Sequence, residues 1–276
     1  MQKLFALTLI LATFAAHAAD APDIPRPTAT LENQQISESS GIAESTIADG
    51  VFWTHNDSGH PPVIFAFNKK GEHLAAVRIA GAQAIDWEDI ASFEFEGEHY
   101  LLIADTGGNR ARKTLYVVKE PSVENPRASA KVEWRITFSF DGPVQDCEAV
   151  AVHPETETIL LATKSPLPDC RVYELPLKPE REVVAKQIAR LKIMAVTAMD
   201  ISRDGRRVVL GTYGPCAEYE RADEQSWADA FAGKPKFRKM PPRKQGEAIC
   251  YGHDSRTLYL TSEGVPAPLW EVPPED

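Results

Sequence analysis

A short phrase recurs five times along this chain, and the repetition restricts the architectures that the chain can adopt. Four of the copies begin with a polar or acidic residue, and small or apolar residues follow. The copies are Ser40–Ala43 (SGIA), Glu88–Ala91 (EDIA), Glu148–Ala151 (EAVA), Met199–Ser202 (MDIS) and Glu247–Cys250 (EAIC). They start 48, 60, 51 and 48 residues apart, which is the period of β-propeller blades.

Each phrase is followed by further segments that are rich in β-branched and aromatic residues, which favours strands. The expected second strands are Gly50–Asn56, His99–Asp105, Thr158–Lys164, Arg207–Tyr213 and Thr257–Glu263. The expected third strands are Val63–Phe67, Thr114–Val118, Arg171–Leu175, Ala217–Arg221 and Pro268–Val272. Ala75–Gly81 and Lys131–Phe140 are the clearest fourth strands. The chain is therefore predicted to be all-β.

The fifth repeat ends at its third strand, and Pro27–Asn33 is a spare strand near the other end of the chain. A strand from there would cover the open edge of the last blade, and open edges are a liability of sheets. We therefore predict a single five-bladed β-propeller over residues 19–276, closed by an N-terminal strand in the last blade. Ala222–Ala232 has the spacing of a short amphipathic helix, which we expect on the flank.

Residues 1–18 have the three parts of a secretory signal peptide. Lys3 supplies the positive charge, Leu4–Ala16 the apolar run, and Ala16-His17-Ala18 the cleavage pattern. The apolar run is too short to span a bilayer. We expect a periplasmic or secreted monomer without membrane insertion.

Charge and cysteine usage narrow the expected ligands. The chain has 30 basic and 40 acidic residues, a net charge of −10, which disfavours nucleic acid as a partner and suits metal cations or neutral ligands. The spacing of its four cysteines fits no zinc pattern. Either the cysteines pair or at least two of them remain buried free thiols. If a disulfide forms, we expect it to join Cys170 to Cys147 or to Cys216.

The repeated phrase places acids at the axis of the predicted propeller. The innermost strand of a blade starts on the face to which the second strand returns, so residues at these two points should meet at the channel mouth. The expected pairs are Ser40 with Asn56, Glu88 with Asp105, Glu148 with Lys164, Met199 with Tyr213, and Glu247 with Glu263. Clustered carboxylates raise one another's pKa. Two arrangements would resolve the crowding. One is a hard cation, which we expect to be Ca²⁺ held by Ser40, Glu88, Glu148 and Glu247. The other is a set of hydrogen bonds around a water-filled channel.

Two classes of function stay open. One is a metal-dependent hydrolase of a phosphoester, or else a glycoside hydrolase, with Asp105, Glu263 and Lys164 as catalytic candidates. The other is a non-catalytic propeller that binds a small-molecule or envelope ligand on the mouth face. Asn56, Asp57, Arg110 and Tyr213 are the candidate ligand contacts. An acid and a cation that share an open pocket would favour the enzyme, and mutual buried pairs would favour the binding module.

Several longer phrases resemble a family of secreted bacterial propeller proteins of unassigned activity, loosely described as WD-repeat-like. They are Asn56–Gly59, Asp86–Ile90, Ala104–Asn109, Asp146–Val150 and Gln245–Ile249. The axial order of Ser40, Glu88, Glu148 and Glu247 is similar to the Ser/Glu ring that holds calcium in five-bladed calcium-activated apyrases, and this similarity implies Ca²⁺ here. Met199 departs from that ring. No apyrase substrate motif is present, so nucleotidase activity is not implied.

Overall fold

The computed structural model describes residues 26–153, 155–178 and 181–275, so the predicted signal peptide lies outside the described residues. The chain is all-β, with α1 (Trp227–Phe231) as the one α-helix of the described part. None of the described helices is long and apolar enough to cross a membrane.

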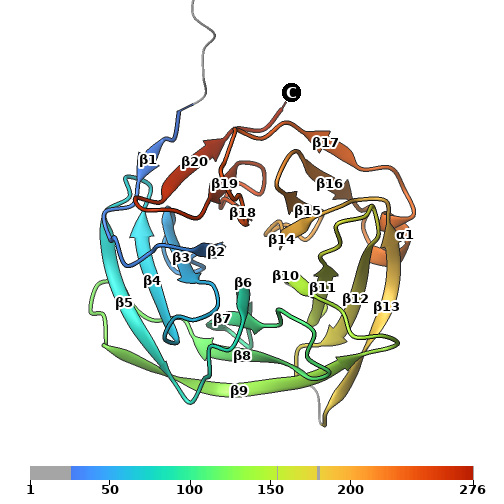
Figure 1. Ribbon diagram of the computed structural model, residues 1–276, viewed down its shortest axis with the longest axis horizontal. Coiled ribbons are helices and arrows are strands. Elements are labelled where there is room, and N and C mark those ends of the chain that lie inside the picture. The colour runs from blue at the N-terminus through green and yellow to red at the C-terminus, as the bar shows by residue number, and fades with distance from the viewer. Residues whose placement is uncertain (1–25, 154, 179–180, 276) are drawn as a thin grey trace, which may run out of the picture.

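The strands form four-stranded antiparallel units that surround a common centre (Figure 1). Unit one is β2 (Ser39–Glu44), β3 (Val51–Asn56), β4 (Val63–Asn68) and β5 (His73–Ala80). Unit two is β6 (Trp87–Phe95), β7 (Glu98–Asp105), β8 (Lys113–Lys119) and β9 (Ser129–Phe140). Unit three is β10 (Cys147–Val152), β11 (Thr158–Thr163), β12 (Cys170–Pro176) and β13 (Val183–Leu191). Unit four is β14 (Val196–Ile201), β15 (Arg207–Thr212), β16 (Cys216–Glu220) and β17 (Lys236–Arg238). Unit five is β18 (Ala248–Tyr251), β19 (Leu258–Thr261), β20 (Pro268–Val272) and β1 (Ala29–Thr30).

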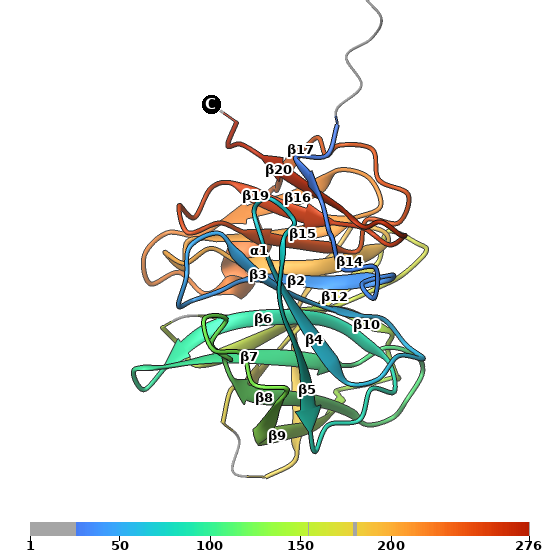
Figure 2. The same ribbon diagram turned by 90° about the vertical axis from the view of Figure 1, so that its left-hand side faces the viewer.

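The two ends of the described chain meet in unit five. Ala29 of β1 pairs with Leu269 of β20 in antiparallel register, and Thr30 pairs with Pro268. Figures 1 and 2 show β1 lying beside β20. The predicted pairing of the 27–33 segment with the 268–272 strand is therefore present.

Long β9 joins units two, one and three at their outer edges. It pairs in parallel with β5, where Arg78 lies opposite Ser129, and with β13, where Val183 lies opposite Phe138. Three units thereby form one twelve-stranded sheet, while units four and five are separate four-stranded sheets. The 131–140 strand was predicted, but these outer pairings leave no signal in the sequence.

The core consists of five apolar clusters, each between two neighbouring units. One of them packs Leu31 and Ile36 of the N-terminal segment, together with Phe67 of unit one, against Tyr259 and Leu269 of unit five. The other clusters join units one and two, two and three, three and four, and four and five. Burial of apolar surface between the units is thus the main force that holds them together.

The predicted helix is present but shorter than the Ala222–Ala232 segment, since α1 covers only Trp227–Phe231. Ser226 caps its N-terminus by accepting a hydrogen bond from the backbone N–H of Asp229. Trp227 and Phe231 are buried and pack in the cluster between units three and four, where the Phe231 ring lies 5.0 Å from the ring of Tyr219. The helix is therefore part of the core.

All four cysteines are buried and free, as the second of the two alternatives predicts, and neither of the two named pairs forms a disulfide. Burial raises the pKa of Cys170 to about 12 and keeps it in the thiol form. Cys147, Cys170 and Cys216 each begin a strand. Buried thiols of this kind behave as small apolar side chains.

Candidate functional site

A β-bulge in each of the first four innermost strands positions the axial side chains. In unit two Trp87 pairs with Asp105 and Asp89 pairs with Ala104, so Glu88 is the extra residue. Glu148 occupies the same position in unit three, between Cys147 and Ala149. An extra residue bends the strand and redirects its side chain. These bulges place Glu88 and Glu148 at the mouth of the ring.

The bulge corrects the alignment of the fourth repeat. Its extra residue is Thr197, between Val196 and Ala198, and not Met199 as the recurring phrase predicts. Met199 is only 1% exposed and lies in the apolar cluster between units three and four. The Thr197 hydroxyl donates to the carbonyl of Gly246 at 3.1 Å. The bulge position of the fourth repeat is therefore held by the hydroxyl-bearing Thr197 and not by Met199.

The structure brings carboxylates together at this mouth in three overlapping groups. Within each group the ligand atoms lie within 4.8 Å of one another. The groups are Asp57 with Asp86 and Glu88, Glu88 with Asp146 and Glu148, and Asp57 with Glu247 and Glu263. Glu88 belongs to two of them, whereas Glu247 is grouped apart from Glu88 and Glu148. The expected single ring is thus divided into parts.

Asp86 and Asp146 were missed as site residues, although the sequence carried a signal for both. Each stands two positions before an axial glutamate, in Asp86-Trp87-Glu88 and in Asp146-Cys147-Glu148. Each aspartate immediately precedes its innermost strand, β6 or β10, so it lies at the same strand end as the glutamate. The repeated acid–x–glutamate pattern therefore predicts paired carboxylates at the mouth, once the glutamates are placed there.

Lys164 neutralises one side of the mouth. Its Nζ lies 2.7 Å from Glu148 Oε2 and 3.7 Å from Glu247 Oε1, so it contacts two carboxylates where one was expected. The Tyr213 hydroxyl donates to Glu247 Oε1 at 2.5 Å. Burial disfavours the charged form of Lys164, but the nearby Glu148 carboxylate holds the pKa of this lysine above its usual value.

Glu88 has no such compensation. It is 5% exposed, and no described residue donates a hydrogen bond to its carboxylate. Burial, followed by the proximity of Glu148 and Asp57, raises the pKa of Glu88 to about 11. A Cβ atom on Gly107 would lie 1.7 Å from Glu88 Oε1, so the glutamate fits only because residue 107 has no side chain.

A buried lysine holds the Gly107–Gly108 turn in place. Lys113 is fully buried, and its Nζ donates to the carbonyl of Gly107 at 2.9 Å and to that of Gly108. The Gly108 N–H in turn donates to Asp146 Oδ1 at 2.8 Å. Lys113 thus fixes the loop that supports both Glu88 and Asp146, a role that the sequence did not predict.

Two other acids at the mouth have raised pKa values. Burial raises the pKa of Glu148 to about 7, although Lys164 opposes the shift. Burial, together with a hydrogen bond to Glu247, raises the pKa of Glu263 to about 8. Protons and a cation would therefore compete for these oxygens near neutral pH.

Other predicted site residues have structural partners. Asp105 is 1% exposed, and its Oδ1 lies 2.7 Å from Arg110 and accepts from the Asp86 N–H at 2.9 Å. The Ser40 hydroxyl donates to the Glu88 carbonyl at 2.6 Å. Asn56 Oδ1 accepts from the N–H groups of Ser37 and Glu38. These contacts favour structural roles for Ser40, Asn56, Asp105 and Arg110.

Apolar side chains surround the acidic mouth. Among the described residues, six of the nine large exposed apolar side chains lie in loops on this face. They are Ile85, Val144, Leu167, Met194, Tyr213 and Val265. Exposed apolar side chains mark interaction surfaces where they form a contiguous patch, and these six lie on the same face as the acids.

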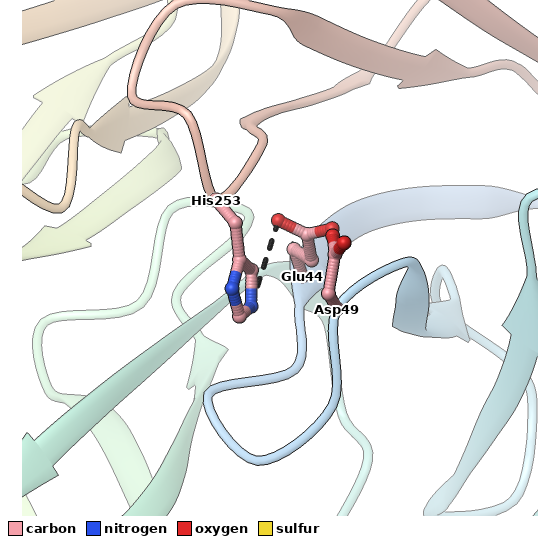
Figure 3. Close-up of side chains that lie close together, drawn as sticks. All are labelled: Glu44, Asp49 and His253. Carbon is pink, nitrogen blue, oxygen red and sulfur yellow. Dashed lines mark ion pairs between the residues drawn. The ribbon is translucent and has the colours of Figure 1, made fainter.

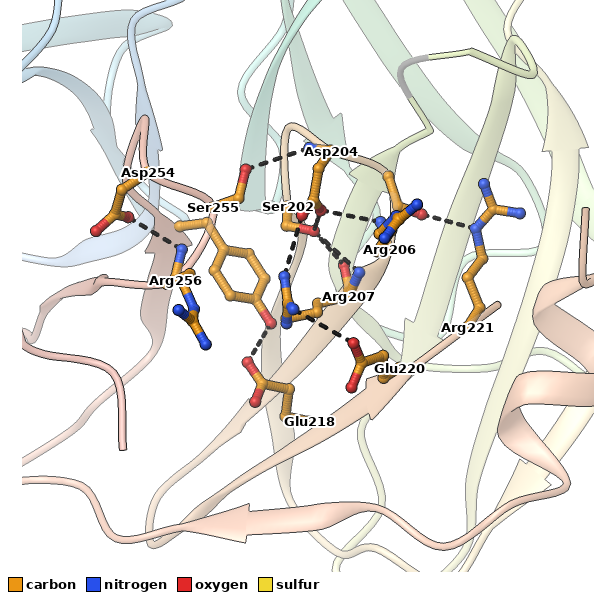
Figure 4. Close-up of polar contacts among 12 residues, drawn as sticks. Ser202, Asp204, Arg206, Arg207, Glu218, Glu220, Arg221, Asp254, Ser255 and Arg256 are labelled. Atoms are coloured by element: carbon orange, nitrogen blue, oxygen red, sulfur yellow. Dashed lines mark hydrogen bonds and ion pairs between the residues drawn. The ribbon is translucent and has the colours of Figure 1, made fainter. Parts of the chain in front are cut away.

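The opposite mouth carries a polar network in which arginine side chains pair with aspartate and glutamate side chains (Figure 4). Arg207 pairs with Asp204 at 3.1 Å and with Glu220 at 3.3 Å, and the Asp204 N–H donates to the hydroxyl of Ser255 at 3.2 Å. A cavity of about 150 Å³ lies beside it, among the ends of the innermost strands. His153, in the turn after β10 on this face, is 1% exposed and packs against Trp227 with ring centroids 6.1 Å apart.

Comparisons with known proteins bear on the fold. No protein-family model and no curated protein sequence match this chain, so the resemblance to bacterial propellers and apyrases gains no support from sequence. A chain of a solved nidogen/laminin complex is similar in structure, with a TM-score of 0.51 and 12% identity, over 82% of this chain and 73% of that chain. Kuenenia stuttgartiensis hydrazine synthase has a TM-score of 0.47 and 11% identity, over 85% and 71% of the two chains. The Dos1 propeller has a TM-score of 0.41 and 11% identity, over 86% and 68%. With the strand arrangement, the nidogen/laminin similarity supports the fold alone, which is that of a β-propeller.

Proposed function

We propose that this chain is an exported five-bladed β-propeller whose acidic mouth binds Ca²⁺ and docks a small-molecule or envelope ligand. The five inter-unit clusters and the pairing of Ala29 with Leu269 support the blade count and the closure. The signal-like residues 1–18 support export. N-terminal sequencing of the protein from a periplasmic fraction tests this part, and we expect a mature chain that begins at Ala19.

The observation that carries the calcium proposal is the environment of Glu88. This buried carboxylate has no hydrogen-bond donor among the described residues, and it lies within 4.8 Å of two other pairs of acids. Like charges this close cannot all ionise without a counter-cation. A divalent cation at this point removes the repulsion without adding protons.

The placement of Lys164 indicates which acids would hold the cation. Glu148 and Glu247 already contact its ammonium group. Asp57, Asp86, Glu88 and Asp146 lie in the groups that share Glu88, and none of them pairs with Lys164. We therefore place the cation on the Glu88 side of the mouth, with Glu148 as a shared ligand. All of the ligand atoms are hard oxygens, which favours Ca²⁺.

Calorimetric titration of the mature protein with Ca²⁺ tests this proposal. We expect stoichiometric binding and a higher melting temperature in Ca²⁺ than in EDTA, because a ligand at 100 times its Kd stabilises the native state by about 2.7 kcal/mol. Glu88→Gln should bind at least tenfold more weakly, and Glu98→Gln, on an exposed strand end, should bind like the wild type. A melting temperature that EDTA and added Ca²⁺ leave unchanged would overturn the calcium site.

Docking is favoured over hydrolysis by the way the charges pair. Asp105, the candidate for orienting water, is buried against Arg110, and Glu148 is paired with Lys164. The apolar side chains around the mouth add a contact surface. We therefore propose that the mouth face binds its ligand and leaves it unchanged.

One observation favours a second candidate function, acid–base hydrolysis of a glycoside or phosphoester. Glu263 is partly exposed, has a pKa raised to about 8, and lies beside Glu247. A protonated acid next to a second carboxylate is the pair that such hydrolysis requires. Chromogenic phosphoesters and glycosides, assayed in Ca²⁺ and in EDTA, test this candidate. Turnover that Glu263→Gln abolishes would establish the enzyme, and absence of turnover on the whole panel would leave docking.

A further inference from the structure

The opposite mouth contains a second group of metal-ligand side chains, at the junction of units one and five (Figure 3). Glu44 ends β2, Asp49 lies in the turn that follows β2, and His253 lies in the turn between β18 and β19. Their ligand atoms lie within 4.8 Å of one another. Residues from the first and the last repeat thus converge on one point.

A buried, unpartnered oxygen faces this point. Glu44 is 3% exposed, and its Oε1 accepts from the N–H of Gly50 at 2.9 Å. Its Oε2 is buried and has no hydrogen-bond partner among the described residues. The one described basic side chain within 4.0 Å is that of His253, whose Nε2 lies 3.9 Å away, beyond hydrogen-bond distance. Buried carboxylate oxygens without a partner are costly and call for an explanation.

The two outer residues lie at the protein surface. The side chain of Asp49 is 67% exposed and lies 3.4 Å from Lys69, a surface ion pair that contributes little to stability. The side chain of His253 is 31% exposed. The two outer ligands are therefore at the surface, where a bound cation can keep water as further ligands.

The hydrogen bonds of His253 are compatible with ligation. Its Nε2 lies 2.9 Å from the carbonyl oxygen of Ser45, and Arg203 donates to the same oxygen at 2.6 Å. A metal ion on Nε2 would replace the contact with Ser45, and Arg203 would keep that carbonyl satisfied. Ligation therefore leaves no buried carbonyl without a partner.

We propose that Glu44, Asp49 and His253 bind a transition-metal ion of the Zn²⁺ type, which links unit one to unit five. The donor set decides the class of metal. Imidazole nitrogen with carboxylate oxygen suits Zn²⁺, whereas Ca²⁺ takes oxygen ligands. The site is separate from the acidic mouth, and it would fasten the first repeat to the last on the opposite face.

Calorimetric titration of the mature protein with Zn²⁺ tests the site. The buffer contains excess Ca²⁺, so that the proposed calcium site is already occupied. We expect one Zn²⁺ per chain and a rise in melting temperature. His253→Ala should weaken binding at least tenfold, and Glu44→Gln should weaken it similarly. His73→Ala, which removes an exposed histidine from β5, should bind like the wild type, as should Glu88→Gln, which alters the other mouth.

The outcomes separate this site from adventitious binding and from the calcium proposal. Loss of Zn²⁺ binding in His253→Ala, but not in His73→Ala, supports the site even if Glu44→Gln fails to fold. Equal binding by all histidine variants, or no stoichiometric binding by the wild type, overturns it. Weakened Zn²⁺ binding in Glu88→Gln would also overturn it, because the metal would then be at the acidic mouth.

Discussion

Lys164 Nζ lies 2.7 Å from Glu148 Oε2, and both side chains are largely buried at the acidic mouth. Lys164→Met should remove the one cation that contacts Glu148 and Glu247. Breaking a fully buried pair costs about 3–5 kcal/mol. Because Lys164 is 25% exposed, we expect a smaller loss, about 1–2 kcal/mol in the free energy of unfolding at pH 8. Urea unfolding measures it.

The matched control is Lys119→Met, which breaks an exposed pair with Glu98 and should cost much less than Lys164→Met, because solvent screens an exposed pair. The loss in Lys164→Met should shrink at pH 5, where Glu148, with a pKa of about 7, is protonated. An equal loss at both pH values would show that the lysine contributes by packing alone.

The raised pKa values at the mouth predict how stability depends on pH in EDTA. Glu148 and Glu263 have pKa values of about 7 and 8 in the folded protein, against 4.5 as the ordinary value. The folded state therefore holds more protons than the unfolded state across this window, and raising the pH lowers the free energy of unfolding. Buried His153 acts in the opposite sense, since its pKa is lowered from 6.5 to about 4. The measurement is therefore best made between pH 7 and 8.5.

In EDTA we expect the free energy of unfolding to fall between pH 7 and 8.5. In Ca²⁺ the same quantity should fall less over this range, because a bound cation takes the place of the protons. Urea unfolding at several pH values gives both slopes. Stability that rises with pH in EDTA would contradict the raised pKa values of the mouth acids.

The sequence predicted the strands because each repeat keeps the same pattern of apolar segments and turns. The third strand of the last unit, Pro268–Val272, has the predicted bounds. The fourth repeat was misaligned because Met199-Asp200-Ile201 imitates Glu88-Asp89-Ile90, whereas the bulge falls two residues earlier, at Thr197. Alternation of apolar residues does not reveal a bulge.

The site was predictable in its acids and not in its pairings. Glu88 and Glu148 are at the mouth as expected, because their place in the repeat fixes the end of the strand at which they lie. The reach of Lys164 to two carboxylates and the closure of Arg110 on Asp105 depend on side-chain conformations. Those follow from loop geometry that the repeat does not encode.

Gly107→Ala should weaken Ca²⁺ binding without changing any charge. An added Cβ would lie 1.7 Å from Glu88 Oε1 and would displace that carboxylate. We expect at least tenfold weaker binding in calorimetry, with far-UV circular dichroism unchanged. Gly214→Ala is the matched control on another loop of this face, where the nearest atom would lie 3.8 Å away. If both variants bind Ca²⁺ like the wild type, the cation does not depend on the position of Glu88.

The N-terminal strand should be necessary for a stable ring. Leu31 is 2% exposed and packs with Phe67 and Leu269 between units one and five. Its replacement by alanine leaves a cavity at that junction and should cost about 2–5 kcal/mol. Gly71→Ala should act at the same place, because its Cβ would lie 2.2 Å from the Thr30 carbonyl oxygen and its φ of +81° disfavours a side chain.

Deletion of residues 27–34 exposes the edge of β20 and should cause aggregation. Thermal melts and light scattering measure these effects. A deletion variant that stays monomeric and melts like the wild type would show that β1 does not close the ring.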